Sequence, residues 1–131
     1  MTLDEILNTA VSAISDNASA LGLSSVEIGR PDFTPSVVPF ALVFLEPLEL
    51  NLLEDALPLR RTRLLTFVGT TFATITQSIT ICEDIFTIYK SIFTDSITKA
   101  RLTIDSYYGD LVVSLLELEI IYEPQTQSQT A

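Results

Sequence analysis

The sequence predicts an α+β domain in which an N-terminal helix and one central helix pack on a mixed or antiparallel β-sheet that ends in a C-terminal β-hairpin. Residues 2–21 and 75–93 place apolar side chains at helical spacing, whereas residues 37–68 and 102–122 contain apolar runs and alternating patterns. A helix docked on an antiparallel or mixed sheet gives an α+β sandwich. We expect a single domain over residues 1–123 and a disordered polar tail over 124–131.

The first element is an amphipathic helix over residues 2–21. Its apolar stripe consists of Leu3, Ile6, Leu7, Ala10, Ala13, Ile14, Ala18 and Leu21. Thr2 and Glu5 have the spacing of a capping box, in which each side chain satisfies a free backbone amide at the start of a helix. Gly22 can adopt the left-handed conformation that ends a helix. The predicted start and end of the helix therefore coincide with the two ends of the apolar stripe.

Three strands are expected next. Residues 24–28 predict a short strand, and residues 29–39 contain three prolines and predict an extended loop. Residues 37–45 are almost continuously apolar and predict a buried strand that runs out past the sheet over residues 46–50. Residues 59–68 predict its antiparallel partner. On this partner, Thr62, Leu64, Thr66 and Val68 share one face, and Arg61, Arg63, Leu65 and Phe67 share the other.

The clearest helical periodicity begins near Ile75. One apolar row is Ile75, Ile79, Cys82, Phe86, Tyr89 and Phe93, and a second is Ile81, Ile85, Ile88 and Ile92. The opposite side is polar and consists of Thr76, Gln77, Thr80, Glu83, Asp84, Thr87, Lys90, Ser91 and Thr94. Thr74 and Gln77 repeat the capping-box spacing. Many of these residues are β-branched, so packing on the sheet has to stabilise the helix.

A β-hairpin closes the domain. Leu102 and Ile104 alternate with polar residues, and residues 116–122 alternate apolar residues with glutamates. Gly109 supplies the turn, and Pro124 ends the last strand. We expect one face of the hairpin to be buried and the other to be solvated.

The composition excludes several classes of function. Seven Lys and Arg residues stand against 17 Asp and Glu residues, which gives a net charge of −10 and argues against specific binding of nucleic acid or anionic lipid. The longest apolar run, residues 37–45, is far shorter than the roughly 20 residues that span a bilayer, so no membrane partner is expected. A single Cys and the absence of a secretory pattern make a cytosolic compartment the default.

The residues also argue against catalysis, metal binding and cofactor binding. Glu83 and Asp84 are adjacent carboxylates that diverge on a helix, and Glu54 and Asp55 are a second adjacent pair. Neither pair has a His or a third carboxylate at matching spacing to complete a metal or catalytic site. Cys82 has no His to act as its base and is expected to pack in the core. The four glycines are scattered and form no phosphate-binding loop. We therefore expect that the protein is not an enzyme and binds no cofactor.

The best candidates for a functional surface are two neighbouring segments. The first is the apolar loop over residues 48–57, between the two long strands, which supplies Leu48, Leu50, Leu52, Leu53, Glu54 and Asp55 as candidate interface residues. Its alternative role is a flap over its own core. Arg60, Arg61 and Arg63 are the second candidate, because on so acidic a chain they can pair with Glu54, Asp55 or a neighbouring subunit. Alternatively, these three arginines are ordinary solvent-exposed strand residues.

In its layout the chain resembles a tail terminator protein of long-tailed bacteriophages, the lambda-type minor tail protein. The resemblance covers residues 2–123: an N-terminal helix, a proline-containing loop into a long strand pair, a central helix and a closing hairpin, on an acidic chain of similar size. It implies a homo-oligomeric ring, generally of six subunits, that caps the tail tube and stops its polymerisation. It also implies tail tube and head–tail connector proteins as partners, and a place in the virion after assembly in the host cytoplasm.

Two other classes of function compete with this interpretation. A small ligand-binding or regulatory α+β domain would bury the excess apolar surface as a dimer around a pocket. An enzyme would have to work with carboxylates, Tyr or Lys alone, and no constellation of residues supports that.

Overall fold

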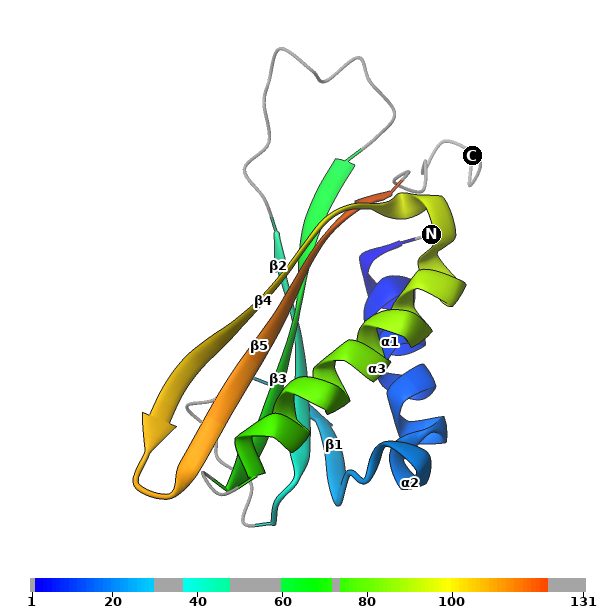
Figure 1. Cartoon of the computed structure of the whole chain (residues 1–131). Helices are drawn as coiled ribbons and strands as arrows, with labels where there is room; N and C mark the ends of the chain where they lie inside the picture. Colours follow the sequence, from blue (N-terminus) through cyan, green and yellow to red (C-terminus); the bar gives the residue numbers. More distant parts are fainter. Residues whose placement is uncertain (1, 30–36, 48–59, 72–73, 123–131) are drawn as a thin grey trace, which may run out of the picture.

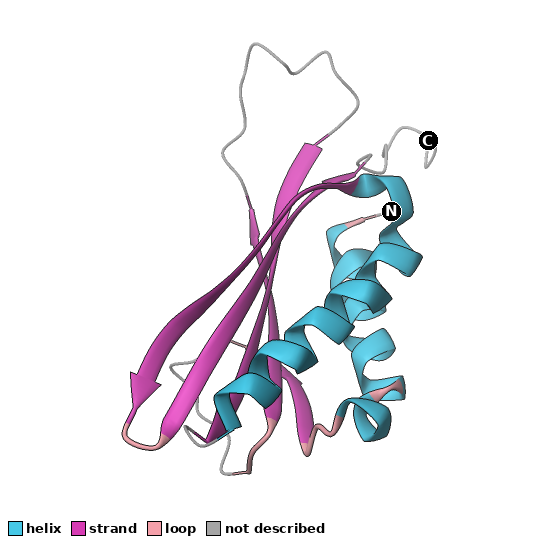
Figure 2. Ribbon diagram, in the orientation of Figure 1, coloured by secondary structure: helices cyan, strands magenta, loops and turns pink. Residues whose placement is uncertain are grey.

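The computed structural model describes residues 2–29, 37–47, 60–71 and 74–122. Five strands form one mixed sheet in the order β1-β2-β3-β5-β4, and the helices lie on one face of it (Figures 1 and 2). Helix α1 packs over β1 and β2, and α3 packs over β3 and β5. This confirms the predicted α+β fold class. The expected disorder of residues 124–131 lies outside the described residues.

The N-terminal helix begins as predicted but is divided in two. Thr2 and Glu5 form the capping box that caps α1 (Leu3–Asp16), and hydrogen bonds to Thr2 lower the pKa of the Glu5 carboxyl. A second short helix, α2 (Ala18–Leu21), follows after Asn17, which leaves the α-helical conformation. Gly22 then ends α2 with a φ of 79°, as expected for the left-handed position. The predicted single helix over residues 2–21 was therefore wrong at Asn17.

The first three strands occur in the predicted order, and β3 has the predicted faces. Strand β1 (Ser25–Ile28) runs parallel to β2 (Phe40–Pro47), which pairs with β3 (Arg60–Thr71) in antiparallel fashion. Strand β2 begins three residues later than the apolar run suggested, directly after Pro39, a residue that cannot donate to a strand ladder. The expected extension of this strand over residues 48–50 lies outside the described residues.

Helix α3 (Ile75–Phe93) begins where its periodicity predicted. The capping box expected from Thr74 and Gln77 was wrong, because the Thr74 side chain caps no amide of this helix. The Thr74 hydroxyl instead donates to the Thr71 carbonyl at 3.0 Å, at the end of β3. All nine residues of the predicted polar side are exposed, so the two predicted apolar rows do identify the face that packs on the sheet.

A short 3-10 turn, η3 (Thr94–Ser96), leads into the closing hairpin of β4 (Ile97–Tyr108) and β5 (Leu111–Tyr122). The hairpin is antiparallel, and Gly109 at its turn has a φ of 60°. Strand β5 lies between β3 and β4, which makes β4 an edge strand. The C-terminal hairpin is thus confirmed.

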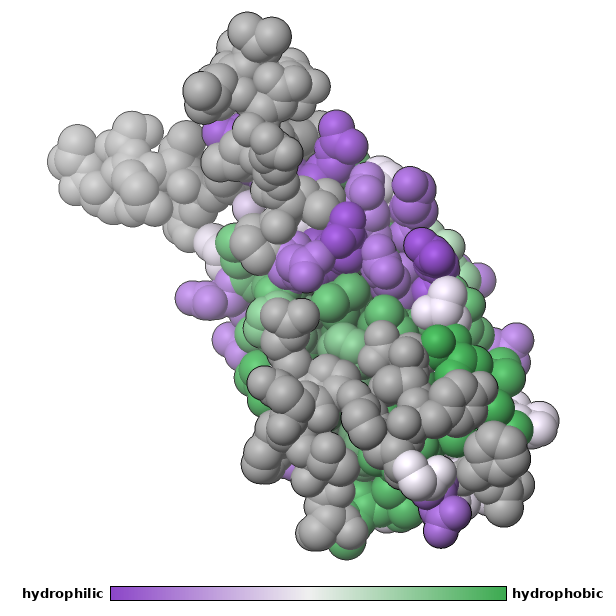
Figure 3. Space-filling model, turned by 90° about the vertical axis from the view of Figure 1, so that its left-hand side faces the viewer, coloured by the Kyte–Doolittle hydropathy of each residue, from purple (hydrophilic) through white to green (hydrophobic). Residues whose placement is uncertain are grey.

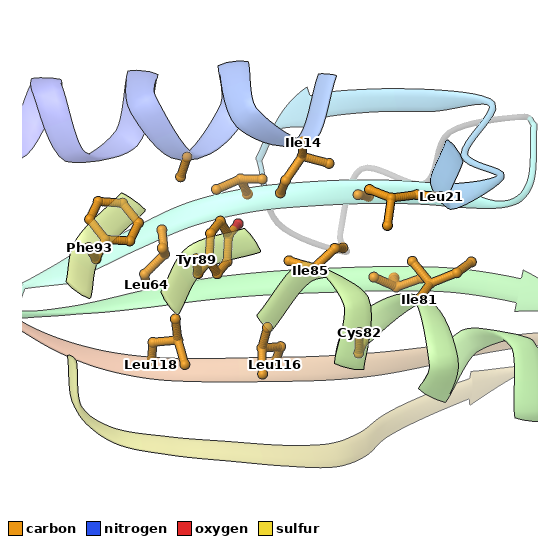
Figure 4. Close-up of a cluster of buried hydrophobic side chains, with 14 of the residues drawn as sticks. Ile14, Leu21, Leu64, Ile81, Cys82, Ile85, Tyr89, Phe93, Leu116 and Leu118 are labelled. Carbon is orange, nitrogen blue, oxygen red and sulfur yellow. The ribbon is translucent and has the colours of Figure 1, made fainter. Parts of the chain in front are cut away.

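The larger core lies between the helices and the sheet (Figure 4). Its buried side chains are mostly aliphatic, with Tyr89 the largest fully buried side chain. The Tyr89 hydroxyl shares a hydrogen bond of 2.8 Å with Thr66, and the hydroxyls of Ser78 and Ser114 are 2.6 Å apart. These contacts satisfy polar groups that burial would otherwise destabilise, and they position α3 on β3 and β5. Burial also raises the pKa of the Tyr89 hydroxyl.

A second buried cluster lies on the opposite face of the sheet. It consists of Phe40, Leu42, Leu65, Phe67 and Val113. The prediction that the outer face of the hairpin is solvated was therefore wrong near the start of β5, where Val113 is buried. The same face becomes polar farther along the strands, as Figure 3 shows in the hydrophilic residues gathered beside a hydrophobic region.

Candidate subunit interface

Charged residues gather at one end of the outer face of the sheet, the face that points away from the helices. The strand register places Glu46 of β2 beside Arg63 of β3, Arg63 beside Glu119 of β5, and Glu119 beside Lys99 of β4. One row across four strands therefore alternates negative and positive side chains. Arg61, Glu117 and Arg101 lie on the same face in neighbouring rows. We call these seven residues the charged band.

Three ion pairs connect strands within the charged band. Arg63 lies 2.6 Å from the Glu46 carboxylate and 3.1 Å from the Glu117 carboxylate, and Arg61 lies 3.7 Å from Glu119. About a third of the Arg63 side chain is exposed to solvent. Partly exposed pairs of this kind stabilise a fold only weakly.

Lys99 and Arg101 differ from these arginines. They lie beside Glu119 and Glu117 in the register, but those carboxylates pair with Arg61 and Arg63. Within the described ranges, neither Lys99 nor Arg101 forms an ion pair. Both are exposed, as are their neighbours from Thr98 to Leu102. The charged band thus ends at the edge strand β4 in two accessible positive charges.

The helix layer has the opposite charge. Its exposed charged residues in α1, α3 and η3 are Asp4, Glu5, Asp16, Glu83, Asp84, Asp95 and Lys90. Six carboxylates and one lysine give this layer a charge of −5, whereas four basic and three acidic residues give the charged band +1. Four of the seven basic residues of the chain therefore lie on the outer face of the sheet.

The residues predicted as interface candidates are only partly described. Leu48, Leu50, Leu52, Leu53, Glu54 and Asp55 lie outside the described residues, and their role in an interface stays a prediction. Arg60, Arg61 and Arg63 lie at the start of β3. The described partners of Arg61 and Arg63 belong to the same chain, in β2 and β5. Contact between these arginines and a neighbouring subunit also stays a prediction.

Sequence reasoning missed Lys99 and Arg101 as candidates. Both alternate with Ala100 and Leu102, a pattern that assigns them to one face of a strand. The pattern could not indicate that this strand lies at the edge of the sheet, because a C-terminal hairpin can add to a sheet through either of its strands. The insertion of β5 between β3 and β4 makes β4 the edge strand.

The other residues with possible chemistry lie apart from the charged band. Cys82 is fully buried, and burial raises the pKa of its thiol to about 12. Glu83 and Asp84 are exposed on α3. Over the part of the chain that the structure describes, no group of three His, Cys, Asp or Glu side chains is placed to hold a metal ion, and no helix is long and apolar enough to cross a membrane.

No family model matches this chain, and no curated protein matches it. The features of this chain that bear on its function are the fold, the distribution of charge over the sheet and the exposed edges of the sheet.

Proposed function

We propose that this protein is a structural subunit of a bacteriophage or prophage tail, similar to a tail terminator. In this role, copies associate head to tail into a ring, of six subunits by the family resemblance, that caps the tail tube. The ring blocks the addition of further tube subunits and provides the joint to the head–tail connector proteins. The mechanism is steric and requires no turnover and no cofactor.

The observation that carries this proposal is the opposite charge of the two exposed edges of the sheet. A ring formed head to tail brings different surfaces of one chain together, so it requires surfaces that complement each other. Strand β1 presents the exposed Glu27 at one edge, and the β4 edge of the charged band presents Lys99 and Arg101 without described ion-pair partners. Complementary charge of this kind favours association in one orientation and disfavours others.

The layout of the fold also supports the proposal. The resemblance implies an N-terminal helix, a long strand pair, a central helix and a closing hairpin, and these elements occur in this order in α1, β2, β3, α3, β4 and β5. The net charge of −10 suits a component of a DNA passage, because an acidic surface repels phosphates and does not hold them. The proposed location is the virion, with assembly in the host cytoplasm.

The test is the absolute mass in solution by light scattering, over a concentration series in low and moderate salt. A closed oligomer, or monomers that convert to one as concentration rises, supports the proposal. The same series is repeated with polymerised tail tubes, whose lengths are measured by electron microscopy with the protein present during assembly. Shortened or capped tubes support the terminator role.

A monomer or dimer at every concentration, with tube lengths unchanged, contradicts the proposal. In that case ligand-dependent melting becomes the next measurement, because a small ligand-binding domain is the competing class.

A further inference from the structure

Each edge of the sheet exposes an apolar side chain, and the two side chains belong to the same row of the strand register. Ile28 on β1 is 53% exposed and Leu102 on β4 is 36% exposed, and both are among the large hydrophobic residues that the fold leaves accessible. The register connects them through a single row: Ile28 lies beside Val43, Val43 beside Thr66, Thr66 beside Leu116, and Leu116 beside Leu102. They therefore lie on the helix-covered face, at opposite ends of one row.

The outer faces of the same two edges have opposite charges. On β1 the exposed residue of the outer face is Glu27, which lies beside Leu42. On β4 the exposed charges of the outer face are Lys99 and Arg101. Each edge thus combines an apolar residue on one face with charge on the other. The negative charge on β1 attracts the positive charges on β4.

The strand directions allow the edges of two copies to pair. Strand β1 is parallel to β2, and each of the three following neighbours, β3, β5 and β4, is antiparallel to the one before it. Strands β1 and β4 consequently run in opposite directions. A second copy placed beside the first in the same orientation presents its β1 antiparallel to β4 of the first copy.

We propose that β4 of one copy docks against β1 of the next, with Leu102 opposite Ile28 and Arg101 next to Glu27. In an antiparallel pair with Leu102 opposite Ile28, Thr103 lies opposite Glu27, so Arg101 and Glu27 become diagonal neighbours on the outer face. Diagonal neighbours are about 7–8 Å apart at the backbone, within reach of long side chains. This inference rests on the proposed ring and names the contact that would build it.

Charge selects this arrangement over the symmetric ones. Pairing β4 with β4 brings Lys99 and Arg101 of both copies together, and pairing β1 with β1 brings two copies of Glu27 together. Like charges across an interface are unfavourable, so each edge prefers the opposite edge of another copy. Every copy then has one edge of each kind to offer, and addition continues until the ring closes.

Cysteine cross-linking tests the contact. Ile28→Cys and Leu102→Cys are prepared as separate variants, and both sites tolerate substitution because they are exposed. Opposed residues of an antiparallel pair have Cα atoms about 4.5–5.5 Å apart, which falls within the range that a disulfide spans. Under mild oxidation, the mixture of the two variants should form covalent dimers, and neither variant alone should do so. Cys82 is buried with a raised thiol pKa and does not compete.

The control variant is Thr87→Cys, an exposed position on α3. Mixed with Leu102→Cys, it should give no more dimer than random collision does. A chain that carries both Ile28→Cys and Leu102→Cys should form a ladder of covalent species that ends at the mass of the ring.

A charge exchange provides the second test. Arg101→Glu should weaken self-association about tenfold, because it places a negative charge next to Glu27. Combining it with Glu27→Arg should restore association. Glu83→Arg, a reversal on α3, should not rescue Arg101→Glu.

The outcomes separate this contact from the proposed function. If the wild-type protein forms an oligomer but the mixed cysteine variants do not cross-link, or Leu102→Cys cross-links to itself, the β4–β1 contact is wrong while the ring proposal stands. If the wild-type protein stays monomeric at every concentration and on tail tubes, both proposals are wrong.

Discussion

The central strands and the edge strands of this sheet carry similar side chains but bury them to different extents. In one row of the helix-covered face, Val43, Thr66 and Leu116 on β2, β3 and β5 are buried, whereas Ile28 on β1 and Leu102 on β4 are exposed. A central residue has strand neighbours on both sides and a helix above it. An edge residue has a neighbour on one side only. The comparison shows that alternation in a strand predicts the face of a side chain, and the place of the strand in the sheet decides its burial.

The largest expected difference in the free energy of unfolding is between variants at Leu116 and at Leu102. Leu116→Ala should lower the free energy of unfolding by about 2–5 kcal/mol, because it leaves a cavity under α3. Leu102→Ala should lower it by less than about 1 kcal/mol, because that side chain is partly in solvent already. Urea unfolding followed by circular dichroism, at one fixed low protein concentration, measures both. Equal losses would contradict the distinction between centre and edge.

The outer face of the central strands should be nearly as sensitive to added volume. A Cβ atom at Gly69 would overlap the ring of Phe40, which covers this glycine from the neighbouring strand β2. Gly69→Ala should therefore cost about 1–3 kcal/mol through overpacking. Gly109→Ala serves as a comparison, since there the added atom meets open space and only the backbone φ of 60° is unfavourable.

The smaller variant Phe40→Leu should recover part of the loss when it is combined with Gly69→Ala. Thermal unfolding of the two single variants and the double variant measures this coupling. If the double variant loses the sum of the two single losses, the ring does not determine the cost at Gly69.

The buried hydroxyl pair between α3 and β3 should contribute less than the apolar contacts around it. Tyr89→Phe removes one partner of the 2.8 Å hydrogen bond and leaves the Thr66 hydroxyl buried without it, at a cost of about 1–2 kcal/mol. Thr66→Val should have a similar cost. The double variant should lose clearly less than the sum, because no orphaned hydroxyl remains, and chemical denaturation of the three variants tests this.

The ion pairs of the charged band should have the smallest effect. Glu117→Gln removes one of the two carboxylates that pair with Arg63 and should lower the free energy of unfolding by less than about 1 kcal/mol, because both side chains are partly exposed. The loss should shrink in higher salt, where surface charges are screened. Glu83→Gln on α3 is the matched control and should change stability less. A salt-independent loss at Glu117 would indicate that the pair is more strongly desolvated than its exposure implies.

Local patterns predicted several features correctly because they depend on a few neighbouring residues. The capping box of Thr2 and Glu5, the start of α3 at Ile75 and the turn at Gly109 each follow from short-range hydrogen bonding or backbone freedom. The similar spacing of Thr74 and Gln77 failed as a capping box because the hydroxyl of Thr74 bonds to the end of β3 instead. A different short-range hydrogen bond, to the last residue of the preceding strand, took the place of the capping one.

The candidate interface was less predictable. Arg61 and Arg63 belong to a basic cluster that is visible in the sequence, but their carboxylate partners on β2 and β5 come from distant parts of the sequence. Lys99, Arg101, Glu27 and Ile28 could not be selected at all, because nothing in a single strand indicates whether another strand will lie beside it. Ser78 was also missed as a core residue, since its burial depends on hydroxyl contact with Ser114.

By itself, the sequence determined the fold class, the faces of α3 and β3, and the excess of acid over base, because periodicity and composition are properties of the chain alone. Only the tertiary structure decided the strand order, and with it which residues lie at the edges. The order depends on the register by which β5 enters between β3 and β4, a pairing between residues far apart in the sequence. That choice left Leu102 and Ile28 exposed at opposite ends of one row, and it created the two surfaces on which the proposed assembly depends.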